Sequence, residues 1–283
     1  MKTIEQIRPL RVELIKARMA GKRIGFVPTM GNLHDGHISL VHEARKQADI
    51  VVSSIFVNPL QFGTNEDLGS YPKTLARDQQ LLEENGCHLL FSPSVNEMYP
   101  NGQGIETIVE VPGLSNIHCG QSRPGHFRGV STVVTKLFGI VQPDLAVFGM
   151  KDFQQLAVIR RMTEDLSLPV SIVGVPTARN RDGLALSSRN GYLSAEQLQI
   201  ATQLYATLSW IKGQIQGGRR DYPTLQEEAN SRLEAAGFKR DYMHICSQRE
   251  LLPATDSDQN IVVLAAAQLG PARLIDNLAF DLN

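Results

Sequence analysis

Two histidines, His34 and His37, stand three residues apart where an apolar run ends and a helical pattern begins. The run, Arg23–Val27, is stopped by Pro28 and predicts a buried strand. Ligands of open α/β sheets bind beyond the carboxyl ends of the strands, and a helix start offers free backbone N–H groups to phosphate. Two imidazoles at that place add N–H donors, and the positive end of the helix dipole favours their neutral form. The segment therefore predicts a phosphate-binding loop.

Two other interpretations of this histidine pair stay open. In the structural one, one imidazole caps the helix and the other packs on the strand. In the second, the pair binds a metal ion, because histidines at i and i+3 can share one. No His-Glu-x-x-His pattern and no neighbouring Cys supports the metal, whereas Gly31 and Gly36 beside the pair favour a loop that a ligand approaches closely.

A second polar segment, Asp182–Leu193, carries Ser187, Ser188 and Arg189 in succession. Two hydroxyls and a guanidinium suit the oxygen-rich end of a triphosphate, since arginine can bind two oxygens at once. The alternative is a helix cap followed by a solvated arginine, and this segment alone does not decide between the two.

Two more polar segments follow predicted strands. In Phe148–Leu156, Lys151 lies at a helix start, where a cation opposes the dipole unless an anion binds beside it. Gln155 follows on the same helix and can hold a hydroxyl or carboxylate if it faces a cleft. In Phe56–Phe62, the strand end carries two amides, Asn58 and Gln61. Together the four segments could enclose a nucleoside triphosphate and a small polar acid.

The elements that must position these residues alternate between apolar strands and amphipathic helices over the first 175 residues. That alternation predicts a Rossmann-like parallel sheet covered on both faces, in an α/β domain of residues 1–175. Residues 176–283 predict a smaller α+β lid domain with two helices and two short strands. The predicted strands are Arg23–Val27, Ile50–Val57, His88–Phe91, Leu145–Phe148, Ser171–Val175, Tyr242–Cys246 and Ile261–Ala267. The predicted helices cover about 4–15, 36–48, 75–84, 130–141, 153–165, 194–214 and 222–236.

Composition excludes several classes of protein. Lys and Arg total 28 against 29 Asp and Glu, so the chain lacks the basic excess of a nucleic-acid binder. Hydrophobic residues make up 42%, which supports a packed core, and the longest apolar run, Ile261–Ala267, is too short to span a membrane. Three widely spaced cysteines and an N-terminal segment without an apolar signal core lead us to expect a cytoplasmic protein.

The polar segments, in their order along the chain, resemble the motif blocks of the pantoate–β-alanine ligase family, within the nucleotidyltransferase superfamily. PTMGNLHDGHISLV is similar to the family's His-x-Gly-His signature, and four further blocks are FVNPLQF, RPGHFRGVSTVVTKLF, FGMKDFQQL and DGLALSSRNGYL. Two positions depart from the expected pattern: Met150 stands in place of Glu, and Ala178 in place of a larger apolar residue.

The resemblance implies a two-step ligation of pantoate and β-alanine driven by ATP, which arrives with Mg²⁺, and it implies a homodimer. Pantoate is first activated as an acyl adenylate, and the amine of β-alanine then displaces AMP. It assigns catalytic roles to His34, His37, Lys151, Ser187, Ser188 and Arg189. It assigns ATP binding to Met30, Gly31, Asn32, Leu33, His34, Asp35, Gly36, His37, Gly149, Met150, Lys151, Asp152, Ala178, Leu186, Ser187, Ser188 and Arg189. It assigns binding of pantoate and β-alanine to Asn58, Gln61, Tyr71, Arg123 and Gln155, and no protein metal site.

Two competing functions stay open from the sequence. A nucleotidyltransferase would attach AMP to a phosphorylated acceptor, but such an acceptor calls for Arg or Lys where the neutral Gln61 and Gln155 stand. A nucleotide-binding module without catalysis would bind ATP and turn nothing over. Pyrophosphate release that depends on pantoate separates both from the ligase.

Overall fold

The computed structural model describes residues 1–63, 68–102 and 104–282. The chain folds as two compact units. Unit 1 comprises residues 1–150 and 155–176, and unit 2 comprises residues 151–154 and 177–283. The short segment Lys151–Gln154 thus packs with unit 2, although it lies within the span of unit 1 along the chain.

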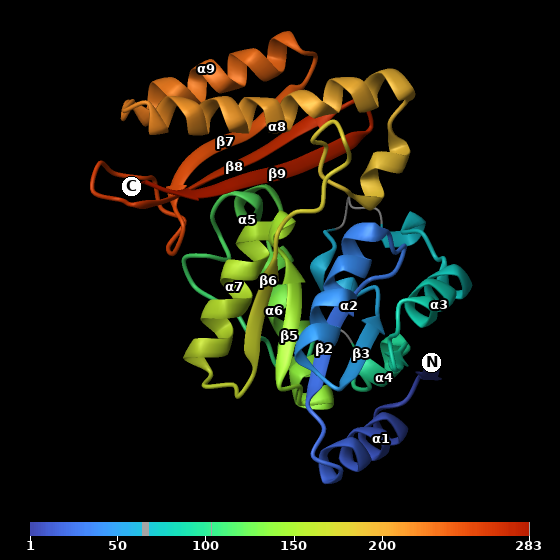
Figure 1. Cartoon of the computed structure of the whole chain (residues 1–283). Helices are drawn as coiled ribbons and strands as arrows, with labels where there is room; N and C mark the ends of the chain where they lie inside the picture. The colour runs from blue at the N-terminus through green and yellow to red at the C-terminus, as the bar shows by residue number, and fades with distance from the viewer. Residues whose placement is uncertain (64–67, 103, 283) are drawn as a thin grey trace. The chain divides into compact units, whose positions relative to one another are not determined.

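Unit 1 is built on a parallel sheet of six strands in the order β1-β4-β3-β2-β5-β6 (Figure 1). The strands are β1 (Lys2–Ile4), β2 (Ile24–Thr29), β3 (Ile50–Ile55), β4 (Leu89–Phe91), β5 (Leu145–Gly149) and β6 (Ser171–Val175). The chain leaves β2 toward β3 on one side and later returns to β5 on the other. That reversal makes the carboxyl end of β2 the topological switch point, where ligands of such sheets bind.

Helices cover both faces of this sheet. Val147 packs in the apolar cluster on the α2 side, whereas the ring of its neighbour Phe148 lies 6.4 Å from that of Phe138 on α6. Successive strand residues point to opposite faces, so α2 and α6 lie on opposite faces of β5. The helices of this unit are α1 (Ile7–Met19), α2 (Asp35–Gln47), α3 (Leu75–Glu84), α4 (Val95–Met98), α5 (Cys119–Ser122), α6 (His126–Val141) and most of α7 (Phe153–Asp165). Short 3₁₀ turns cover η1 (Pro59–Gln61), η2 (Leu68–Ser70) and η3 (Met150–Asp152).

Unit 2 holds an antiparallel sheet in the order β7-β8-β9, with α8 and α9 side by side over one face (Figure 1). Its elements are η4 (Ser188–Tyr192), α8 (Ala195–Gln216), α9 (Tyr222–Ala235), β7 (Lys239–Ser247), β8 (Asn260–Leu269) and β9 (Ala272–Asp281). Leu208 and Ile211 of α8, Leu225 of α9 and Val263 of β8 are fully buried in its core.

The predicted fold class, a parallel α/β domain with a smaller α+β domain, is confirmed. Several elements differ from the predicted ones, and the short helices α4 and α5 were not predicted. The opening segment begins with the edge strand β1, and its helix is displaced to Ile7–Met19. Helix α6 begins at His126, four residues before the predicted start. Strand β9 was missed in sequence because charged and amide residues interrupt it.

No helix in the described part of the chain is both long enough and apolar enough to cross a membrane.

Candidate functional site

The loop after β2 has an unusual backbone conformation, which a carboxylate from a distant part of the sequence stabilises by hydrogen bonds. Gly31 and Asn32 follow each other with φ of 86° and 51°, in the left-handed region. Oδ2 of Asp78 accepts the backbone N–H of Asn32 at 2.8 Å, and Oδ1 accepts that of Leu33 at 2.9 Å. A Cβ at Gly31 would lie 3.1 Å from Oδ2 of Asp78, so a glycine suits the position sterically as well.

The two histidines cap the start of α2 reciprocally. Nδ1 of His34 accepts the backbone N–H of Gly36 at 3.1 Å, and Nδ1 of His37 accepts the backbone N–H of His34 at 3.3 Å. A nitrogen that accepts a backbone N–H carries no proton, so each neutral imidazole has its proton on Nε2. Both imidazoles therefore cap the start of α2, whereas the structural interpretation expected one to cap the helix and the other to pack on the strand.

Amide and guanidinium groups gather around Gln61 at the end of η1. Nδ2 of Asn58 lies 3.2 Å from Oε1 of Gln61, and Nε2 of Gln61 lies 3.1 Å from Sδ of Met30. The backbone carbonyl of Gln61 accepts Nδ1–H of His126 at 2.8 Å, and Nη1 of Arg123 contacts Nε2 of the same imidazole at 3.1 Å. Gln61 itself is only 8% exposed. A predicted substrate amide and a predicted substrate arginine thus share one neighbourhood.

The other predicted residues of unit 1 lie on the same loops or on the neighbouring strand end. The ring of Tyr71 packs edge-on against Phe62, the residue after Gln61, at 5.9 Å. Asp35 and Gly36 form the first turn of α2. Gly149 ends β5, Met150 follows it in η3, and Gln155 lies in the first turns of α7, half-buried.

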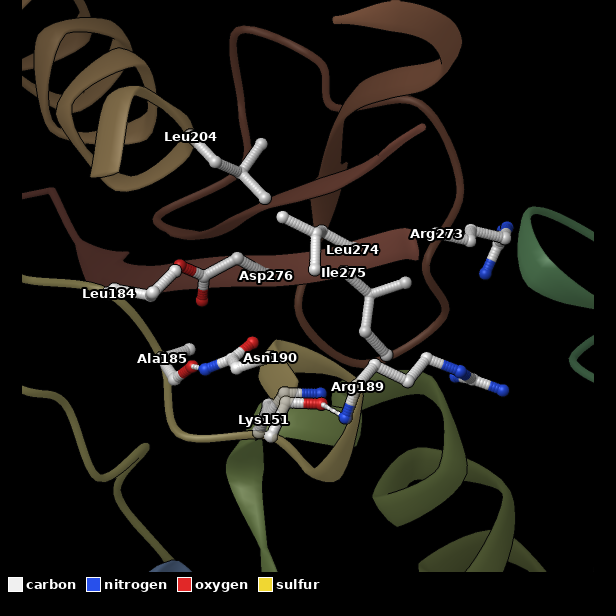
Figure 2. Close-up of a pocket in the computed structure, with 11 residues that line it drawn as sticks. Lys151, Leu184, Ala185, Arg189, Asn190, Leu204, Arg273, Leu274, Ile275 and Asp276 are labelled. Atoms are coloured by element: carbon white, nitrogen blue, oxygen red, sulfur yellow. Dashed lines mark hydrogen bonds between the residues drawn. The ribbon is translucent and has the colours of Figure 1, made fainter. Parts of the chain in front are cut away.

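Unit 2 brings together the predicted phosphate ligands Lys151, Ser187 and Arg189. They line one pocket with Asn190 and with residues of β9 (Figure 2). The amide Nδ2 of Asn277 holds the backbone carbonyl of Lys151 at 2.8 Å, which fixes the segment that carries this lysine. The clustering of a lysine with arginine and serine side chains suits a polyanion.

Asp276, one of the residues that line the pocket, forms a partly buried ion pair with Arg179. Nη1 and Nη2 of Arg179 lie 2.6 and 2.9 Å from the two carboxylate oxygens of Asp276, and the guanidinium stacks 3.7 Å above the ring of Tyr205. Asp276 is only 4% exposed. Because this pair is bidentate and stacked, Arg179 compensates the charge of Asp276, which therefore does not oppose an anion beside Lys151 and Arg189.

The segment that contains Ser187 is also a turn with its own hydrogen bonds. Oγ of Ser187 accepts the backbone N–H of Arg189 at 3.3 Å, as the capping alternative predicted. The backbone N–H of Leu186 donates to the carbonyl of Ala178 at 2.9 Å, so these two predicted nucleotide residues lie opposite each other. A capping hydroxyl still donates its own proton, so the cap does not exclude a phosphate contact. Ser188 begins η4, and Asp152 is exposed.

Sequence reasoning missed the residues that position these groups. Asp78 left one signal, a carboxylate four residues from the buried Leu82 and on the same helix face. Arg179 and Asp276, 97 residues apart, left none. Among the described residues, no three His, Cys, Asp or Glu side chains are grouped to hold a metal ion.

Comparisons with known proteins address the chain as a whole. The model of the Pantoate-beta-alanine ligase family matches residues 2–279. A pantothenate synthetase of Pseudomonas fluorescens is 60% identical over 283 residues, covering 100% of this chain and 99% of that relative. One of Stutzerimonas stutzeri is 61% identical over 282 residues, with the same coverage.

Solved structures agree with the sequence relatives. The crystal structure of pantothenate synthetase from Thermus thermophilus superposes with a TM-score of 0.91 at 46% identity, covering 98% of this chain and 99% of that one. Pantoate-beta-alanine ligase from Francisella tularensis, complexed with beta-gamma ATP and beta-alanine, has a TM-score of 0.81 at 35% identity, covering 98% and 97%. On these matches over nearly its full length, this chain belongs to the pantoate-beta-alanine ligase family.

Proposed function

We propose that this protein joins pantoate and β-alanine to form pantothenate, with cleavage of ATP to AMP and pyrophosphate. The carboxylate oxygen of pantoate attacks the α-phosphorus, and the bond to the bridging oxygen of pyrophosphate breaks. The amine of β-alanine then attacks the acyl carbon, loses a proton and displaces AMP. Family membership supports this reaction, and the neutral Gln61 supports a carboxylic rather than a phosphorylated acceptor.

The observation that carries the proposal is that Nδ1 of each histidine accepts a backbone N–H, which leaves Nε2 of each neutral ring as the donor. Phosphoryl transfer gives side chains little to do beyond positioning and stabilising charge. Two Nε2–H donors at a helix start, beyond the carboxyl end of β2, suit the negative charge that grows on the phosphate oxygens. Because neither ring must gain or lose a proton, the donors are in place before the reaction begins.

We assign the remaining roles as the resemblance to the family implies them. Lys151, Ser187, Ser188 and Arg189 hold the phosphate chain, and Gln61, with Gln155, binds the pantoate oxygens. The nucleotide is lined by the residues from Met30 to His37, together with Gly149, Met150, Asp152, Ala178 and Leu186. Asn58, Tyr71 and Arg123 support the pantoate end. Residues 1–175 then serve as the nucleotide and pantoate domain, and residues 176–283 as the lid.

Mg²⁺ belongs to the proposal as a companion of the nucleotide. Mg²⁺ is commonly held by substrate phosphates and only one or two carboxylates, which fits a described chain without a three-ligand acidic cluster. When bound with ATP, the ion would shield the phosphate charge, and Lys151 and Arg189 would bind phosphate oxygens. We further propose a homodimer and a cytoplasmic location; Cys87, Cys119 and Cys246 are buried and form no disulfide with one another, which suits a reducing compartment.

The deciding experiment follows pyrophosphate, AMP and the amide product from ATP, Mg²⁺ and D-pantoate, with and without β-alanine. We expect steady release of pyrophosphate and AMP, together with pantothenate, only when both acids are present. Pyrophosphate release that ignores pantoate would instead support a nucleotidyltransferase, and none under any condition would support a binding module. Sedimentation equilibrium tests the dimer.

A further inference from the structure

The amide of Asn58 has all its hydrogen-bonding capacity occupied inside unit 1. Nδ2 donates to the backbone carbonyl of Gly129 at 3.1 Å and to Oε1 of Gln61 at 3.2 Å. Oδ1 accepts the hydroxyl proton of Tyr99 at 2.8 Å and the backbone N–H of Leu60 at 3.4 Å. Asn58 is 1% exposed, so water does not compete for these contacts.

The chemistry of two backbone groups fixes which way this amide points. Oxygen and nitrogen of an asparagine are told apart by their partners. The carbonyl of Gly129 can only accept, so the nitrogen of Asn58 must face it, and the N–H of Leu60 can only donate, so the oxygen must face that side. The orientation of Asn58 therefore follows from the backbone itself.

Gln61 takes its orientation from Asn58 in turn. Because Asn58 offers it an N–H, Gln61 turns Oε1 toward Asn58 and presents Nε2 on its other side. Nε2 there lies 3.1 Å from Sδ of Met30, and a thioether is a weak acceptor. Gln61 is thus set as a donor, and the ligand group that suits it is an oxygen with lone pairs.

Tyr99 completes the relay from the far side. Its side chain is 4% exposed, and burial raises the pKa of the phenol well above its usual value, so the hydroxyl stays protonated and donates. The O–H of Tyr99 stabilises the orientation in which Oδ1 of Asn58 faces it. The flipped orientation is unfavourable, because it would place an N–H of Asn58 against the N–H of Leu60.

We propose that Tyr99 is a positioning residue that acts through Asn58 to hold Gln61 as an N–H donor, which selects a carboxylate or hydroxyl oxygen of the acid substrate. This inference rests on the proposed function, in which Gln61 binds pantoate. Tyr99 itself touches no substrate. The relay Tyr99–Asn58–Gln61 sets the polarity of the site rather than its shape.

The first test is the steady-state kinetics of Tyr99→Phe, which keeps the ring and removes the O–H. We expect the KM for pantoate to rise roughly tenfold, as for a lost hydrogen bond to a buried oxygen, with the KM for ATP unchanged. The matched control is Tyr222→Phe in unit 2, since the Tyr222 hydroxyl is also buried but has no hydrogen-bond partner within the described part of the chain. The control should leave the KM for pantoate unchanged.

The second test compares Asn58→Asp with Asn58→Ala and does not depend on the first variant. Aspartate is nearly isosteric with asparagine but lacks its two N–H groups, so Gln61 turns its own N–H toward the carboxyl and Oε1 toward the substrate. Alanine favours neither orientation. The inference predicts a higher KM for pantoate in Asn58→Asp than in Asn58→Ala, whereas packing alone predicts the reverse.

The outcomes separate this inference from the proposed function. If the unmodified protein releases no pyrophosphate with pantoate, the proposed function is wrong, and the inference about the relay is wrong as well. If the protein is active but Tyr99→Phe keeps its KM for pantoate, or Asn58→Ala is the weaker binder of the two Asn58 variants, the relay alone is wrong.

Discussion

Leu33 donates its backbone N–H to Oδ1 of Asp78 at 2.9 Å, although 45 residues separate the two in sequence. The other carboxylate oxygen accepts Asn32 N–H at 2.8 Å and the hydroxyl of Thr74 at 3.0 Å. One buried carboxylate on α3 therefore determines the path of the loop that leads into the histidine pair. The loop's own residues, with two successive positive φ angles, would not hold that path alone.

Asp78→Asn should damage this loop more than its small change in shape suggests. The oxygen of the new amide can accept one of the two backbone N–H groups. Its NH₂ group must then face the second backbone N–H, with which it cannot form a hydrogen bond. We expect the free energy of unfolding to fall by about 1–3 kcal/mol and the KM for ATP to rise. Chemical denaturation and initial rates measure the two effects. The same stability loss with an unchanged KM for ATP would show that Asp78 is structural only.

Gly129 lies where α6 passes η1, and a Cβ there would lie 2.3 Å from the carbonyl oxygen of Leu60 and 2.7 Å from the backbone nitrogen of Gln61. Gly129→Ala should therefore destabilise the protein by about 1–3 kcal/mol and raise the KM for pantoate, because η1 must move.

The matched control is Gly139→Ala on the same helix, where the added Cβ meets nothing within 4 Å. Alanine is the better helix former, so this variant should gain up to about 1 kcal/mol in unfolding free energy. Equal effects of the two substitutions would refute the close approach of α6 and η1.

Much of the architecture was predictable because parallel strands buried on both faces read as apolar runs. Strands β2, β3, β5 and β6 were predicted within a few residues for that reason. Strand order was not predictable, since the partners of a strand are chosen by crossovers and not by its own residues. Strand β9 was missed because Asp276 and Asn277 are buried in it, and their burial depends on partners far away in sequence.

The candidate site shows the same division. Groups that follow strand ends, such as His34, His37 and Gln61, were found from their type and position. Groups that orient them, such as Asp78 and Tyr99, were not, because a buried polar residue becomes meaningful only when its partner is known. The roles assigned to the site residues stay predictions until the variants are measured.

Arg179→Lys tests whether the pair with Asp276 needs the guanidinium rather than a positive charge. Lysine keeps the charge but loses the two-point contact and the stacking over Tyr205. We expect a loss of about 1–3 kcal/mol in unfolding free energy, measured by urea titration. Arg240→Lys is the control in the same unit, because Arg240 pairs with exposed carboxylates. A loss as large in the control would contradict the special role of Arg179.

His88 predicts an acid-sensitive step in stability. Burial lowers the pKa of His88, with Arg45 and Lys22 acting in the same direction, and its Nδ1 accepts the backbone N–H of Val51 at 3.0 Å. The unfolded chain then binds more protons than the folded one as pH falls through the ordinary histidine pKa, so stability is full above about pH 6.5 and declines below it.

His88→Asn keeps an acceptor for Val51 and removes the titration. Between about pH 7.5 and 5.5 its unfolding midpoint should fall less steeply than that of the unmodified protein. His88 is only partly buried, so the difference should be small. Parallel curves for the two proteins would rule out His88 as the titrating group.

Two replacements of His37 distinguish the role of its Nδ1 atom from that of its Nε2 atom. Asparagine places an oxygen near Nδ1 and keeps the cap on the backbone N–H of His34, whereas glutamine places an N–H near Nε2 and loses that cap. If the Nε2 proton stabilises the transition state, His37→Asn should lower kcat by about 10²–10³-fold while the protein stays stable. His37→Gln should keep more activity yet lose about 1 kcal/mol of unfolding free energy. We therefore expect His37→Asn to be the more stable variant and His37→Gln the more active one. If the more stable variant is also the more active one, capping accounts for the whole effect of His37.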